Sequence, residues 1–101
     1  MTPSNMDPKK KYPLYVAVHG GPSGVWSKRY LGGCDEYGEM IDPTTCLKNF
    51  LDEGFIVLQP NPRGSDGYGI QFRLANFSDF GGGDYEDIMS GVDNLIQLLL
   101  F

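Results

Sequence analysis

The residues of this sequence best suited to chemistry lie in two glycine-rich segments. The first is the HGGP sequence of residues 19–22, which directly follows an apolar run. A glycine pair there lets the backbone turn sharply and approach a ligand without a Cβ in the way. Preorganised backbone N–H donors can stabilise the oxyanion that forms when a nucleophile attacks a carbonyl. The residues of this candidate oxyanion loop are His19, Gly20 and Gly21.

The second segment joins NPRGS at residues 61–65 to GYG at residues 67–69. An arginine here can hold a carboxylate with two parallel hydrogen bonds. We expect Arg63 to pair with one of the acids near Asp84 rather than with a substrate. Asp84 and Asp87 themselves fit the first turn of a helix better than acid–base catalysis. The loop therefore has a structural or substrate-side role, for which the candidates are Arg63, Gly64, Ser65 and Tyr68.

A nucleophile is not evident in the sequence. The G-x-S-x-G elbow of α/β-hydrolases fits none of its serines. Ser23 has a glycine two residues before it but Val25 two residues after, and Ser65 has Gly67 after it but Arg63 before it. In such enzymes the histidine follows the serine and the acid. His19 is therefore expected to hold its loop locally rather than to act as the base.

Two strands and one helix are expected to position these loops. Residues 14–18 and 55–58 are short apolar runs, typical of strands buried on both faces in parallel sheets. Between them, Asp42 suits a helix N-cap, Pro43 the first helical position and Gly54 the residue just past the helix end. The pattern predicts a parallel βαβ unit of the α/β class.

Further elements follow that unit. Residues 70–76 suggest a short helical turn, and a longer helix begins after Gly83, with one apolar stripe that includes Ile88, Val92 and Leu95. Two parallel strands cannot close a core of their own. We therefore interpret residues 1–101 as one incomplete domain, of which 1–11 form a flexible lead-in.

Composition excludes several classes of function. The net charge of −5 argues against nucleic acid as the main partner. No signal peptide or membrane-length apolar segment is evident, which favours the cytoplasm and no membrane. Cys34 and Cys46 suit free thiols better than a disulfide. With His19 as the only histidine, no metal site is expected, and no cofactor is implied.

Taken together, the HGGP, NPRGS-x-GYG and GGGDY sequences, with the KYPL entry at residues 11–14, resemble the prolyl oligopeptidase family, in its acylaminoacyl-peptidase and dipeptidyl-aminopeptidase branches. The resemblance covers most of the chain. It implies a partial α/β-hydrolase domain of a serine-type peptidase that hydrolyses short peptides through an acyl-enzyme. The N–H of Gly21 would be the oxyanion donor. The catalytic triad would lie beyond the last residue, so the chain alone would be inactive.

Three alternative functions compete with this interpretation. An esterase fragment would usually carry HGGG, where this sequence has Pro22. A nucleotide-binding module fails because G-x-G-x-x-G would need a glycine in place of Phe72. A non-catalytic binding product remains open, since the apolar end at residues 98–101 suggests possible self-association. With a peptide as the expected partner, its cleavage preference stays undetermined.

Overall fold

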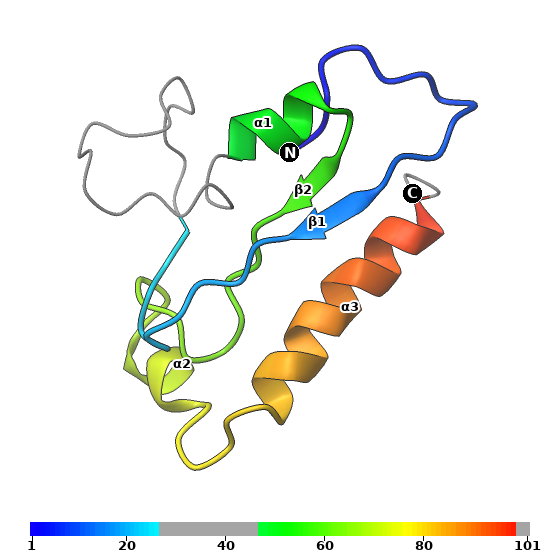
Figure 1. Ribbon diagram of the computed structural model, residues 1–101. Helices are drawn as coiled ribbons and strands as arrows, with labels where there is room; N and C mark the ends of the chain where they lie inside the picture. The colour runs from blue at the N-terminus through cyan, green and yellow to red at the C-terminus, as the bar shows by residue number, and fades with distance from the viewer. Residues whose placement is uncertain (27–46, 99–101) are drawn as a thin grey trace, which may run out of the picture.

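The chain forms a short parallel sheet with helices around it (Figure 1). The computed structural model describes residues 1–26 and 47–98. In this part of the chain, no helix is long and apolar enough to cross a membrane. The elements in order are β1 (Leu14–Val16), α1 (Leu47–Asp52), β2 (Ile56–Leu58), α2 (Ile70–Leu74) and α3 (Gly83–Gln97).

The predicted parallel βαβ unit is confirmed. β1 pairs with β2 in parallel, with Leu14 opposite Ile56 and Val16 opposite Leu58. One bond continues past the strand, because the Ala17 N–H donates to the Leu58 carbonyl at 2.9 Å. The first strand is nevertheless shorter than predicted, since it ends at Val16.

Burial differs between the two strands. Ile56 and Val57 of β2 are almost fully buried, as predicted, and their side chains point to opposite faces of the sheet. All three residues of β1 are only half-buried, so the prediction of a strand buried on both faces is wrong for β1. The core that covers the sheet is small, and it centres on Ala17, Leu47 and Val57.

The C-terminus of α1 is closed by a Schellman motif. Gly54 has a φ of +87°, and its N–H donates to the Leu51 carbonyl at 3.1 Å. The next N–H, of Phe55, donates to the Phe50 carbonyl at 2.8 Å, and the two phenyl rings pack edge to face 5.5 Å apart. Gly54 thus ends the helix as predicted. The predicted start at Asp42 and Pro43 lies outside the described residues, as do Cys34 and Cys46.

α3 begins where the sequence predicts and runs alongside the strands (Figure 1). A Cβ added to Gly91 would lie 3.4 Å from a Leu58 methyl carbon, so the helix packs closely on β2. Its first turn contains the predicted Asp84 and Glu86. A carboxylate from the preceding turn also caps it, because Asp79 Oδ2 accepts a hydrogen bond from the Gly83 N–H at 3.0 Å.

The first residue of the chain contacts β2. The terminal ammonium of Met1 donates to the Val57 carbonyl at 2.6 Å, and the Val57 N–H donates back to the Met1 carbonyl at 2.9 Å. These two bonds use the edge of β2 that does not face β1.

Candidate functional site

The loops that follow the two strands meet at one end of the sheet. Because the strands are parallel, both carboxyl ends point the same way, and α2 lies at that end (Figure 1). His19 Nε2 lies 2.9 Å from Ser65 Oγ, and the Asp66 N–H donates to the Gly24 carbonyl at 3.2 Å. The structure therefore brings together the two glycine-rich segments singled out in the sequence.

Gly21 lies at the exposed tip of the first loop. Its φ of +128° falls in the range that favours glycine. A Cβ at this position would lie 2.9 Å from the Gly24 nitrogen, whereas a Cβ on Gly20 would meet nothing within 4 Å. Among the described residues, no acceptor bonds the Gly21 N–H.

The far end of the same loop is held by a side chain from the second loop. The Asn61 carboxamide receives the Trp26 N–H at 2.8 Å and donates to the Trp26 carbonyl at 2.9 Å. The Trp26 indole N–H donates to the Ala17 carbonyl at 2.9 Å. Sequence reasoning missed this pair, although Asn61 opens a recognised motif and Trp26 is the only tryptophan.

Arg63 forms the predicted ion pair, and its partner is Asp87 on α3. Arg63 Nε donates to Asp87 Oδ2 and Nη2 to Oδ1, both at 2.8 Å, while the Arg63 backbone N–H donates to Oδ2 at 2.9 Å. Gly83 lies against the guanidinium, where a Cβ would collide with it. The hydrogen bonds from the Arg63 side chain lower the pKa of Asp87 below its ordinary value of 3.8, although partial burial opposes them. The pair ties the second loop to α3.

This lowered pKa predicts a pH dependence for the loop. The stabilising contribution of Asp87 is complete above the ordinary carboxyl pKa of 3.8 and is lost as the pH falls through the lower pKa of the folded state. We expect hydrogen exchange of residues 61–66, corrected for intrinsic rates, to accelerate in Asp87→Asn at neutral pH. The difference from wild type should shrink below about pH 4.

Glu86→Gln is the matched control for this experiment, because it removes a neighbouring acidic charge that makes no hydrogen bond to Arg63. It should leave exchange of the loop near the wild-type rate. A constant difference between Asp87→Asn and wild type from pH 7 to pH 2.5 would contradict the lowered pKa.

The remaining predicted residues of the second loop differ in their surroundings. Ser65 is fully buried, and its hydroxyl donates to the Pro62 carbonyl at 2.8 Å. Gly64 packs on the buried side chain of Asn76, whose Nδ2 has no hydrogen-bond partner within residues 1–26 and 47–98. Tyr68 is exposed, and its hydroxyl accepts a hydrogen bond from Asn61 Nδ2 at 3.0 Å. Tyr68 therefore lies at the rim of the site, while Gly64 and Ser65 lie beneath it.

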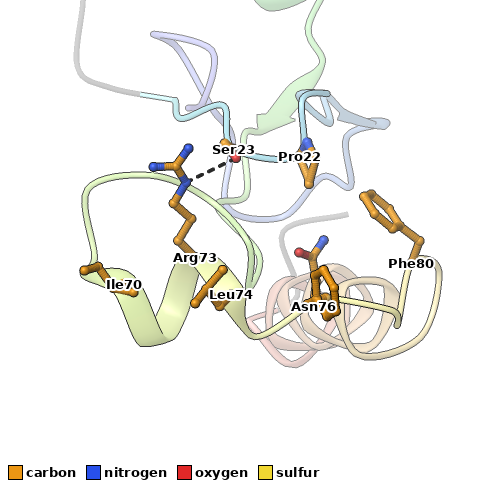
Figure 2. A pocket seen from close by; sticks show the side chains of 8 residues that line it. Pro22, Ser23, Ile70, Arg73, Leu74, Asn76 and Phe80 are labelled. Atoms are coloured by element: carbon orange, nitrogen blue, oxygen red, sulfur yellow. Dashed lines mark hydrogen bonds between the residues drawn. The ribbon is translucent and has the colours of Figure 1, made fainter.

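A cavity of about 560 Å³ opens beside the tip of the first loop. Figure 2 shows Pro22 and Ser23 on one side of it and α2 with the following turn on the other, where Arg73 Nε bonds Ser23 Oγ at 3.3 Å. Arg73 also pairs with Asp66 at 3.2 Å. Half of the lining residues have apolar and strongly exposed side chains, namely Ile70, Leu74, Phe77 and Phe80. The size lies within the range usual for ligand pockets.

Among the described residues, no group of three or more histidine, cysteine, aspartate or glutamate side chains could hold a metal ion. The groups that the two loops and α2 bring to this site include backbone N–H donors, the imidazole of His19 and the guanidinium groups of Arg63 and Arg73.

Comparison with known proteins gives consistent matches. A family profile described as the prolyl oligopeptidase family matches residues 45–101. Dipeptidyl-peptidase 5 of Schizosaccharomyces pombe is 38% identical over 91 residues, which cover 90% of this chain and 12% of that protein. Dipeptidyl-peptidase 5 of Aspergillus oryzae is 37% identical over 89 residues, covering 88% of this chain and 11% of that protein. The chain thus spans about a tenth of these relatives' length.

Solved structures show the same likeness in three dimensions. An acylaminoacyl peptidase in complex with Z-Gly-Gly-Phe-chloromethyl ketone superposes with a TM-score of 0.69 at 30% identity, over 96% of this chain and 14% of that one. The uncomplexed acylaminoacyl peptidase of Pyrococcus horikoshii gives a TM-score of 0.66, also at 30% identity, over 96% of this chain and 13% of that one. The fold described above is therefore part of an α/β-hydrolase fold.

Proposed function

Since this chain belongs to the prolyl oligopeptidase family of serine peptidases, we propose that it is the oxyanion-side segment of a peptidase catalytic domain. In that role it binds the carbonyl oxygen of a scissile peptide bond. The serine, acid and histidine of the triad are supplied by residues outside these 101. The chain by itself is inactive, because no G-x-S-x-G elbow occurs in it.

The observation that carries this proposal is the N–H of Gly21. It lies at the exposed tip of a loop at the carboxyl end of β1, and no described residue accepts its hydrogen bond. When serine attacks a peptide carbonyl, the oxygen gains negative charge. A donor already in place stabilises that charge more than it stabilises the neutral substrate. The geometry supports Gly21 as one such donor.

The cavity beside the loop supports a peptide as the substrate. Pro22 and Ser23, the residues directly after the proposed donor, form one of its walls. Apolar side chains opposite them can pack against a substrate side chain, while the guanidinium of Arg73 can meet a backbone carbonyl. A short peptide bound at Gly21 would thus also contact this cavity.

Labelling of the native protein by a fluorophosphonate probe, which reacts with activated serines, tests the proposal. An antibody against residues 1–26 would isolate the protein, and mass spectrometry would locate the label. We expect a labelled product much larger than the 11.2 kDa of this chain, with the label on a serine outside residues 1–101. An 11.2 kDa native product that takes up no label would contradict the peptidase proposal.

A second candidate function is favoured by the exposed side chains of α2 and the turn after it. Ile70, Phe77 and Phe80 are each at least 70% exposed, which is typical of a surface that another protein covers. A product that only binds, through self-association, would show concentration-dependent mass by analytical ultracentrifugation. Replacement of Phe77 by serine would reduce that association, whereas a monomer at all concentrations would contradict it.

A further inference from the structure

We propose that Ser65 is a positioning residue, which acts through the imidazole of His19 to fix the direction of the Gly21 N–H. The inference rests on the proposed function, because it concerns the aim of the oxyanion donor. It adds to that function a fully buried residue of the second loop, 44 positions further along the chain than Gly21.

Three consecutive contacts connect Ser65 to the donor. The Ser65 hydroxyl lies 2.8 Å from the Pro62 carbonyl and 2.9 Å from His19 Nε2. On the other side of the ring, His19 Nδ1 lies 3.2 Å from the Gly20 carbonyl oxygen. The imidazole thus bridges the buried floor of the second loop and the backbone of the first.

The last contact matters because of peptide planarity. The Gly20 carbonyl and the Gly21 N–H belong to one planar trans peptide group, in which they point in opposite directions. A hydrogen bond that fixes the carbonyl therefore also fixes the N–H, which points away from the ring. No described residue bonds the Gly21 N–H itself. Its orientation therefore depends on the contact between His19 Nδ1 and the Gly20 carbonyl oxygen.

The packing around the imidazole leaves it little freedom. A Cβ at Gly24 would lie 2.8 Å from His19 Nδ1 and 2.6 Å from the Gly20 oxygen, so glycine at this position makes room for that contact. The Trp26 ring packs edge-on to the imidazole, with 6.3 Å between ring centroids. Ser65 has no exposed surface, which makes its hydroxyl a fixed point.

The test uses the full-length peptidase and its variant Ser65→Ala. Misplacement of a catalytic group by about 1 Å can cost a hundredfold in rate, so we expect kcat to fall by about tenfold to a hundredfold with KM within about twofold of wild type. The Ki of a peptidyl trifluoromethyl ketone, which forms an oxyanion on the enzyme, should rise by a similar factor. Binding of the product peptide should not change.

Ser90→Ala is the matched control. Ser90 also donates its hydroxyl to the carbonyl three residues before it, at 2.7 Å, but it lies on α3 outside both loops. It should keep the wild-type kcat.

In His19→Asn the amide nitrogen replaces Nδ1 and can still donate to Gly20, so this variant should retain more activity than His19→Ala. Adding Ser65→Ala to His19→Asn should not lower kcat further, because His19→Asn has already removed the contact between Ser65 and the imidazole.

Two outcomes would overturn the proposal: a kcat of Ser65→Ala within twofold of Ser90→Ala, or equal losses in transition-state and product binding. If Ser65→Ala fails to fold, the comparison of His19→Asn with His19→Ala decides.

If the wild-type protein hydrolyses nothing, the proposed function fails, but the positioning can still be tested with ¹⁵N-glycine labelling. The Gly21 amide signal should then shift in Ser65→Ala and stay in place in Ser90→Ala; no shift in either would refute it.

Discussion

Replacement of Gly21 by alanine is expected to lower kcat of the proposed peptidase by about a hundredfold or more, the usual cost of losing one oxyanion donor. The new Cβ would lie 2.9 Å from the Gly24 nitrogen and 3.1 Å from the Ser23 nitrogen, and alanine is strained at the φ of +128°. The loop must therefore shift and carry the Gly21 N–H with it. KM should change little, because the lost interaction is made mainly in the transition state.

Gly81→Ala is the control for backbone strain. Gly81 also has a positive φ, of +77°, but a Cβ there would meet nothing within 4 Å, and the residue precedes α3 outside both loops. It should cost about 1 kcal/mol of stability and leave kcat at the wild-type value. Steady-state kinetics on a peptide anilide would measure both variants. A Gly21→Ala enzyme with wild-type kcat would exclude Gly21 as the donor.

Gly64→Ala is expected to destabilise the domain by about 2–4 kcal/mol, since left-handed strain and overpacking act together. Its φ is +100°, and the added Cβ would lie 2.6 Å from the carboxamide carbon and oxygen of Asn76. Asn76 is only 3% exposed, so its side chain has little room to yield. The free energy of unfolding in urea, compared with that of wild type, would measure the loss.

Two further variants separate the causes of that loss. Gly67→Ala shares the positive φ, at +89°, but its Cβ would be in open space, so it should show only the strain, about 1 kcal/mol. Asn76→Ala removes the side chain with which the Cβ collides. In the Gly64→Ala background it should restore part of the stability, a coupling that additive effects would not give. Strictly additive losses would show that the two residues do not collide.

Local signals in the sequence were sufficient to predict much of the fold. Gly54 ends α1 because glycine is the residue most favoured at the left-handed position of a Schellman motif, and the charged first turn of α3 was visible in Asp84 and Glu86. The burial of β1 was overestimated. An apolar run shows what a strand could bury, whereas the burial itself depends on elements far away in the chain. Among the described residues, such cover is found mainly over β2.

The candidate site was predicted in part. Both loops were recognised, and Arg63 was expected to bind an acid near the start of α3. Which acid it binds could not be read from the sequence, because that depends on the rotation of the helix about its axis. The contact between His19 and Ser65 was missed for a related reason: the two residues are 46 positions apart. Their meeting follows from the parallel register of the strands that precede them.

At two glycines of the site, the space that a Cβ would take is filled by a single neighbouring side chain. In evolutionary terms, each glycine and its neighbour form a unit, since a larger residue at one position is tolerable only if the other becomes smaller. Substitutions at the two positions of a pair should therefore be correlated among relatives, as is usual for residues in direct contact. The pairs are Gly64 with Asn76, and Gly83 with Arg63.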